Sequence, residues 1–249
     1  MAGPVRGPVS DDLLREVLEA NLVIPREGLA TLTWGNVSGL DRERGIYVIK
    51  PSGVPYDELA VEHLVPVEVE TGRVLAGDLK PSTDSETHRL LYLEHAGLGG
   101  VAHTHSTYAV SFAQAGRPVP VLGTTHADTF NGPVPLTRHL TADECARDYE
   151  LNTGRVLVEA MGSRPGGDAL DVPGALVAGH GPFTWGPSAT KAVEHSVILE
   201  AVAQMALHTL ALNPAATSPG HLFERHFTRK HGPDAYYGNP DRMVAAARA

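Results

Sequence analysis

The chain has 249 residues, 42% of them hydrophobic, which is enough to bury one large core. Its formal net charge of −9 argues against nucleic acid or an anionic membrane as the main partner, but it allows a local basic pocket for a small anion. The one cysteine, Cys145, cannot form an internal disulfide, and no N-terminal apolar stretch is typical of a signal peptide. We therefore expect a cytoplasmic protein with one α/β domain, in which Cys145 is a small buried residue.

The first part of the chain predicts a flexible tail, a capped helix and two strands. Residues 1–9 contain two Gly-Pro pairs and no apolar period, so the domain is expected to start at residue 10. Ser10 can cap a helix with Asp11 and Asp12 in its first turn and an apolar stripe through residue 22. Residues 46–50 and 64–70 read as strands, and a turn at 71–72 follows the second.

The remainder predicts further helices separated by short strands. A helix is expected over 85–94, and it leads into a strand that contains His103. Thr141 and Glu144 form a capping-box pattern for another helix, and 175–178 is a short apolar strand. Residues 163–171 read as a surface loop, and the longest helical run, 188–212, ends at an Asn-Pro pair.

Two histidines one residue apart, His103 and His105, suggest a metal site. In an extended strand their side chains point to the same face, roughly 6 to 7 Å apart, so both imidazoles could bind one ion. The alternative is two polar residues on a solvated strand, and the spacing alone does not decide. Asp84 and His180 are candidate further ligands at element ends, although Asp84 could instead be a plain N-cap and His180 a buried, hydrogen-bonded histidine. Three histidines and a carboxylate suit zinc, manganese or a related divalent ion.

Three segments carry small hydroxyls, glycine and one cation in expected loops, a combination typical of phosphate sites. They are 36–38, which includes Asn36; 50–53, which includes Lys50, Ser52 and Gly53; and the pair Ser82 and Thr83. Each segment taken singly could be an ordinary turn. Most other histidines are expected to be solvated, among them His88.

The ordered motifs of the chain resemble the L-ribulose-5-phosphate 4-epimerases of the class II aldolase superfamily, which also includes the L-fuculose-phosphate aldolases. The resemblance spans nearly everything after the tail. It is carried by Thr-Trp-Gly-Asn-Val-Ser at 33–38, Ile-Lys-Pro-Ser-Gly-Val at 49–54, Leu-Lys-Pro-Ser-Thr-Asp at 79–84, His-Thr-His-Ser at 103–106, Gly-Thr-Thr-His-Ala-Asp at 123–128, His-Gly-Pro-Phe at 180–183, Arg-Lys-His-Gly at 229–232 and Ala-Tyr-Tyr-Gly at 235–238.

This resemblance implies a single domain over 10–238, with a central, mainly antiparallel sheet flanked by helices and a C-terminal tail at 239–249. It implies a divalent metal, usually zinc with manganese as the alternative, held by Asp84, His103, His105 and His180. It places Asn36, Lys50, Ser52, Gly53, Ser82 and Thr83 around the substrate phosphate. Asp128 and Tyr237 are implied to be the acid/base pair, with Thr124, Glu150, His226 and Arg229 near the site.

The implied reaction is the interconversion of L-ribulose 5-phosphate and D-xylulose 5-phosphate by retro-aldol cleavage and re-addition. The alternatives are an aldolase that cleaves a related sugar phosphate and a non-catalytic, adducin-like scaffold. The resemblance also implies a tetramer with sites at subunit interfaces, where a neighbouring subunit orders Tyr237. One departure matters: Ala178-Gly179 stands where the family commonly has His-Ser, which puts the surroundings of the metal ligands in doubt.

Overall fold

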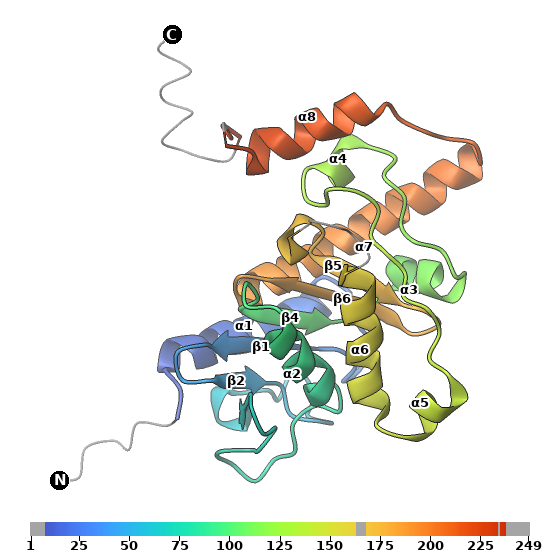
Figure 1. Ribbon diagram of the computed structural model, residues 1–249. Helices are drawn as coiled ribbons and strands as arrows, with labels where there is room; N and C mark the ends of the chain where they lie inside the picture. The colour runs from blue at the N-terminus through green and yellow to red at the C-terminus, as the bar shows by residue number, and fades with distance from the viewer. Residues whose placement is uncertain (1–7, 163–167, 234, 238–249) are drawn as a thin grey trace, which may run out of the picture.

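Six short strands form one sheet in this computed structural model, which describes residues 8–162, 168–233 and 235–237. The strands are β1 (Asn36–Asp41), β2 (Ile46–Ile49), β3 (Val65–Glu68), β4 (Gly100–His103), β5 (Gly174–Val177) and β6 (Gly181–Gly186). Their order is β3-β2-β1-β4-β6-β5, and every neighbouring pair is antiparallel (Figure 1). The prediction of a mainly antiparallel sheet flanked by helices is confirmed.

Helices cover both faces of the sheet (Figure 1). On one face, α1 (Asp11–Arg26) and α7 (Ala189–Leu212) pack on Val37, Val48 and Ala102. On the other, α2 (Ser85–Glu94) and α6 (Tyr149–Gly162) pack on residues such as Tyr47 and Val101. Val37, Val48 and Ala102 alternate along their strands with residues of the opposite face, as the two-residue period of a strand requires.

Three of the remaining helices lie around one end of α7. A third apolar cluster joins α3 (Thr107–Gln114) and α7 to Val119, Phe130 and Val134. α4 (Thr124–Ala127) packs on α7, and α8 (Gly220–His231) packs on α4. The short α5 (Ala142–Ala146) and two 3₁₀ turns, Val61–His63 and Ala169–Asp171, complete the described elements.

By its length and composition, α7 could cross a membrane. One helix of this kind is weak evidence that a protein spans a membrane. Within the described residues α7 is the one helix with this property. Its Ala192, Leu199 and Ala203 are buried in the core, and the helix packs on β4 and β6. Burial against the sheet therefore accounts for its apolar composition.

The helix caps agree with the sequence signals. Ser10 Oγ accepts a hydrogen bond from the Leu13 N–H (3.2 Å), and Thr141 with Glu144 forms the expected capping box. α2 has the predicted bounds. Val9 already packs in the core, one residue before the cap of the first helix.

Three expectations were wrong. Residues 36–38 open strand β1 and are not a loop. Cys145 is exposed, because the short α5 that carries it buries none of its residues. His88 is fully buried between α2 and the sheet. The expected loop at 163–171 lies partly outside the described residues.

Candidate metal and phosphate site

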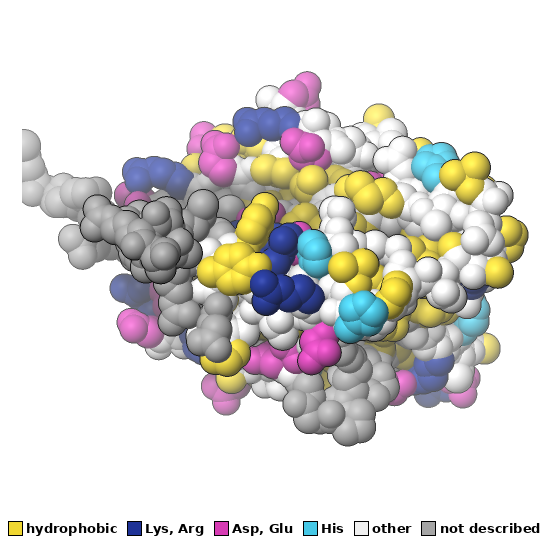
Figure 2. Space-filling model, turned by 90° about the horizontal axis from the view of Figure 1, so that it is seen from above, with side chains coloured by type: hydrophobic (Ala, Val, Ile, Leu, Met, Phe, Trp, Pro, Cys, Tyr) yellow, Lys and Arg dark blue, Asp and Glu magenta, His cyan; other side chains and the backbone are white. Residues whose placement is uncertain are grey.

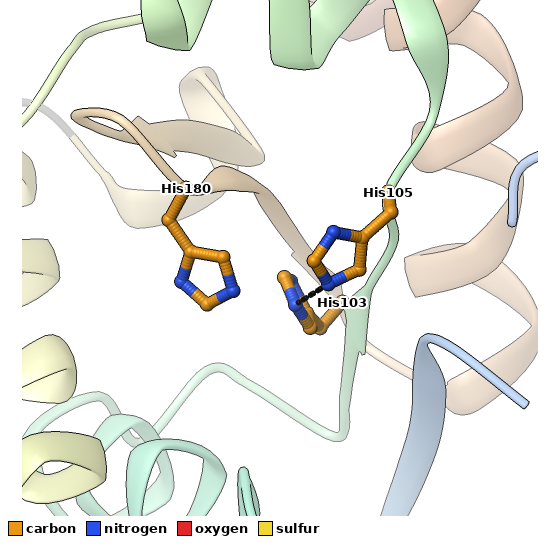
Figure 3. A group of neighbouring side chains, drawn as sticks. All are labelled: His103, His105 and His180. Carbon is orange, nitrogen blue, oxygen red and sulfur yellow. Dashed lines mark hydrogen bonds between the residues drawn. The ribbon is translucent and has the colours of Figure 1, made fainter.

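Three imidazoles from the ends of β4 and β6 converge on one point (Figure 3). His103 is the last residue of β4, His105 follows two residues after it, and His180 precedes β6. Their ligand nitrogens all lie within 4.8 Å of one another. The two histidines do not share the face of one strand as predicted, because β4 ends at His103. Their imidazoles nevertheless lie close together, as expected.

The ring nitrogens are arranged as metal ligands require. His103 Nδ1 lies 3.0 Å from the carbonyl oxygen of Pro182, so Nδ1 carries the proton and Nε2 carries the lone pair. This Nε2 lies 3.1 Å from His105 Nε2. Two nitrogen ligands of a tetrahedral zinc ion are roughly 3.3 Å apart. A divalent ion therefore fits this group, and Phe183, stacked on His103 at 4.2 Å, fixes the ring plane.

Burial keeps all three imidazoles in the form that binds metal. It lowers the pKa of His103 to about 3 and also lowers the pKa of His105 and of His180. Only a neutral imidazole offers a lone pair to a metal ion. The cluster is therefore ready to bind a cation at neutral pH without first releasing protons.

Asp84 lies beside this cluster. The sequence allowed it to be either a metal ligand or a plain N-cap, and its hydrogen bonds argue against the plain N-cap. It occupies the N-cap position of α2, yet its side chain makes no capping hydrogen bond. Its carboxylate instead accepts a hydrogen bond from Asn36 Nδ2 (2.6 Å). Burial acts to raise the pKa of Asp84, but its interactions with His103, His88 and Asn36 outweigh burial and lower the pKa, so the carboxyl group is ionised. Asp84 lines the same cavity as the histidines without belonging to their close group.

The strand register brings the predicted phosphate residues to the same place. Asn36, the first residue of β1, pairs with His103, the last residue of β4, so the two lie side by side at the ends of the two central strands. Reciprocal backbone hydrogen bonds, from Ser52 N–H to Lys80 and from Ser82 N–H to Lys50, join the other two loops. The result is a cavity of about 280 Å³, and all of the predicted phosphate residues line it: Asn36, Lys50, Ser52, Gly53, Ser82 and Thr83.

Lys50 is a buried cation without a carboxylate partner in the described part of the chain. It is 2% exposed, and its Nζ contacts the carbonyl oxygens of Thr33 and Pro51 at 3.4 Å and the ring of Tyr56. Burial lowers its pKa to about 8. An uncompensated ammonium in a cavity lined by hydroxyls is complementary to an anion.

A second cluster of charged residues forms between α4 and α8. Arg229 donates to both carboxylate oxygens of Asp128 (3.1 Å), and His226 Nδ1 lies 3.0 Å from Asp128 Oδ1. The guanidinium of Arg229 stacks 4.5 Å from the ring of Tyr237, which is 51% exposed. Figure 2 looks down on this end of the molecule, where Lys and Arg side chains gather beside histidine and hydrophobic side chains.

The charged cluster around Asp128 does not reach the histidine cavity of its own chain. Among the described residues that line that cavity, none comes from α4 or α8. Five of the predicted site residues thus lie around α4 and α8, apart from the histidines: Asp128, Tyr237, His226, Arg229 and Thr124. Glu150, at the start of α6, does line the cavity.

Sequence reasoning missed several residues around the cavity. His88 Nδ1 lies 2.7 Å from Ser38 Oγ, which lies 2.7 Å from the Tyr92 hydroxyl, and this buried chain supports the side of α2 that carries Asp84. The signal for His88 was its position four residues after Asp84, on the same face of the helix.

Two aromatic side chains also border the histidines. The Tyr149 hydroxyl lies 3.4 Å from His180 Nδ1, and the ring of Trp34 lies 5.7 Å from that of His105. Both side chains line the cavity. No local pattern in the sequence distinguished them from ordinary packing residues.

Known proteins resemble this chain in sequence over most of its length. The model of the class II aldolase and adducin N-terminal domain matches residues 15–207. A protein from Salmonella paratyphi C named L-ribulose-5-phosphate 4-epimerase UlaF is 50% identical over 227 residues, 91% of this chain and 98% of that protein. Its namesake from Salmonella typhi is 49% identical over the same length.

Solved structures share the fold at lower identity. An L-fuculose 1-phosphate aldolase superposes with a TM-score of 0.74 at 21% identity, covering 88% of this chain and 95% of the other. The L-fuculose-1-phosphate aldolase of Thermus thermophilus gives 0.61 at 23% identity, with 82% and 98% covered. These likenesses support the fold, and the sequence matches establish the relationship. The chain belongs to the class II aldolase and adducin family.

Proposed function

We propose that this protein is a metal-dependent epimerase that interconverts L-ribulose 5-phosphate and D-xylulose 5-phosphate in the cytoplasm. The observation that carries the proposal is one cavity that holds a cluster of three neutral imidazoles and an unpaired buried lysine. A sugar phosphate offers both matching groups, a phosphate for the lysine and vicinal oxygens for a metal ion. Relatives that are 50% identical in sequence are named L-ribulose-5-phosphate 4-epimerase, which supports the choice of substrate.

His103, His105, His180 and Asp84 would hold a divalent ion, which we propose to be zinc, with manganese as the alternative. When bound, such an ion polarises the carbonyl of the ketose and stabilises negative charge that develops on its oxygens. Lys50, Asn36 and the hydroxyls of Ser52, Ser82 and Thr83 would hold the phosphate at the other side of the cavity. The sugar is thereby fixed at both ends of its reacting segment.

Inversion at the fourth carbon needs two proton-transferring groups. The hydrogen on that carbon is not activated, so cleavage of the adjacent carbon–carbon bond is the easier route. One group must take the proton of the fourth-carbon hydroxyl during cleavage, and another must return a proton after the aldehyde has turned its other face. We assign these tasks to Asp128 and Tyr237, with His226 and Arg229 positioning Asp128.

Because the cluster of Asp128 and Tyr237 stands apart from the cavity of its own chain, we infer that a second copy supplies it. α8, which carries His226 and Arg229 of this cluster, buries none of its residues. An amphipathic helix with no buried side chain is typical of a segment that packs on a partner. We propose a homotetramer in which each cavity is completed by the acid/base cluster of a neighbouring subunit.

The test is turnover of L-ribulose 5-phosphate by the metal-loaded protein. We expect D-xylulose 5-phosphate as the product, measured with a coupled assay, and no accumulation of free glycolaldehyde phosphate. Release of the aldehyde without epimer formation would instead identify an aldolase. No consumption of either pentulose phosphate by fully metal-loaded protein would contradict both interpretations.

Lys50→Met should raise the stability of the fold and weaken phosphate binding. Protonated Lys50 is disfavoured in the fold, since burial lowers its pKa from 10.5 to about 8. Folded stability therefore falls as pH drops from about 10.5 to about 8 and stays reduced below that range. After allowance for water in the cavity, the methionine variant should be more stable at pH 7 by about 1 kcal/mol.

The same variant should lose about tenfold in phosphate affinity, because a charge-assisted contact is removed. Thermal unfolding with and without inorganic phosphate measures both effects. The wild-type midpoint should rise with phosphate, whereas the variant midpoint should start higher and respond little. Equal responses in the two proteins would remove Lys50 from the phosphate site.

Metal binding should persist to unusually low pH. An isolated histidine site loses metal as its imidazoles become protonated near about pH 6.5. Here burial lowers the pKa of His103, His105 and His180, so each stays neutral at pH values below its ordinary range. Zinc competition against a chromophoric chelator should show full occupancy at about pH 6 and release at lower pH. Loss of half the metal at about pH 6.5 or above would contradict this expectation.

A further inference from the structure

A second lobe opens on the far side of the histidine cluster. It has a volume of about 400 Å³ and shares Trp34, His105, Tyr149 and His180 with the phosphate cavity. Its own lining is Val110, Gln114 and Gly179. The two lobes therefore meet at the imidazoles, and a ligand held there can extend into both.

The chemistry of the second lobe differs from that of the first. The described residues that line it include no Lys, Arg, Asp or Glu, whereas the first lobe contains Lys50 and Asp84. Histidines aside, its polar side chains are those of Trp34, Tyr149 and Gln114. Its own chain offers a second phosphate or a carboxylate no charged side chain in this lobe, so the lining suits an uncharged, hydroxylated group.

Gln114 is the side chain in this lobe that is free to bind a ligand. It is exposed at the end of α3, and its amide makes no hydrogen bond among the described residues. Tyr149, in contrast, is directed to His180. A primary amide has both a donor and an acceptor, which is the complement of one alcohol group.

The backbone around Gln114 is fixed relative to the metal ligands. Glu200 of α7 accepts hydrogen bonds from the N–H groups of Tyr108 and Ala109 (2.9 Å each), which caps α3 just after His105. The N–H of Gly179 donates to the carbonyl oxygen of Ala113 (3.0 Å), which ties the turn before His180 to the end of α3. These hydrogen bonds fix the backbone position of Gln114 relative to His105 and His180.

We propose that the second lobe receives the non-phosphorylated end of the ketose and that Gln114 determines specificity by hydrogen-bonding its first-carbon hydroxyl. The inference rests on the proposed function for its substrate. With the phosphate held by Lys50 and the middle of the sugar at the imidazoles, the first carbon points away from the phosphate lobe. The neutral lining and free amide match a hydroxymethyl group there.

The experiment compares wild-type and Gln114→Leu proteins, both metal-loaded, on L-ribulose 5-phosphate and on its 1-deoxy analogue. Leucine keeps nearly the size of the side chain and removes its amide. We expect the variant to lose about tenfold in kcat/KM on L-ribulose 5-phosphate and to be unchanged on the analogue. Ser111→Ala, on the same helix but outside both lobes, should match the wild type on both compounds.

Direct binding of the same two compounds, by calorimetry, keeps this test separate from that of the proposed function. If the wild type binds L-ribulose 5-phosphate more tightly than the analogue and Gln114→Leu does not, the inference stands even without turnover. If the variant weakens both compounds equally, or neither, Gln114 does not contact the first-carbon hydroxyl. That result would leave the epimerase assay of the wild type unaffected.

Discussion

His105→Ala is expected to remove the bound divalent ion and to lower kcat/KM for pentulose phosphate epimerisation by about 10³-fold or more. The cluster has three close imidazoles, and removal of one leaves two at the centre with the neighbouring Asp84. The ion then loses a ligand, and the reaction loses several kcal/mol of charge stabilisation. Metal content by mass spectrometry and turnover with excess added zinc measure the two effects.

The matched control is His208→Ala, which removes an exposed histidine of α7 outside both lobes. It should retain full metal content and full turnover. The assignment of His105 as a metal ligand requires metal content and turnover to fall together in His105→Ala. If that variant kept one ion per chain, the three imidazoles would not be the metal centre.

The sequence predicted those parts of the fold that depend on local signals. Ser10 and Thr141 each cap a helix where expected, because a cap needs only its own side chain and the next turn. β1 was missed because Gly39 interrupts its β-forming pattern. A Cβ at Gly39 would lie 2.7 Å from Val17, so the glycine is needed for the close approach of α1 to the sheet. That requirement is tertiary and leaves no local signal.

The candidate site was predictable in its parts but not in its arrangement. The His-x-His spacing indicated two ligands, yet the pairing of Asn36 with His103 depends on the register of two strands that lie far apart in the chain. Likewise, nothing local showed that Asp128 and Tyr237 share a cluster apart from the metal cavity. Strand register and the packing of α8 on α4 decide these placements, and neither has a periodic signature in the sequence.

Tyr237→Phe is expected to keep the metal ion and to lower epimerisation by about 10² to 10⁴-fold, the usual range for the loss of one acid/base group. The ring stays on Arg229, since that contact needs the aromatic face and not the hydroxyl. Folding and metal content should therefore be unchanged, and the loss should be in kcat. Steady-state kinetics and metal analysis on the same preparation measure this.

The chain offers a close control in Tyr236→Phe. Tyr236 is also exposed, but its ring stacks on Arg225, whose guanidinium donates to its hydroxyl (3.1 Å). This variant should turn over like the wild type. Normal turnover by Tyr237→Phe would show that the Tyr237 hydroxyl transfers no proton.

Mixing subunits then tests where the Tyr237 hydroxyl acts. If each cavity uses the tyrosine of a neighbour, unfolding and refolding Tyr237→Phe together with His105→Ala forms some sites with intact histidines from one chain and an intact tyrosine from the other. With random mixing of equal amounts, about a quarter of the sites are complete, so activity should return to roughly that fraction of the wild type. If both groups of each site come from one chain, every site lacks one of them and the mixture stays inactive. Recovered activity therefore requires a site built from two subunits, with Tyr237 reaching the histidines of its neighbour.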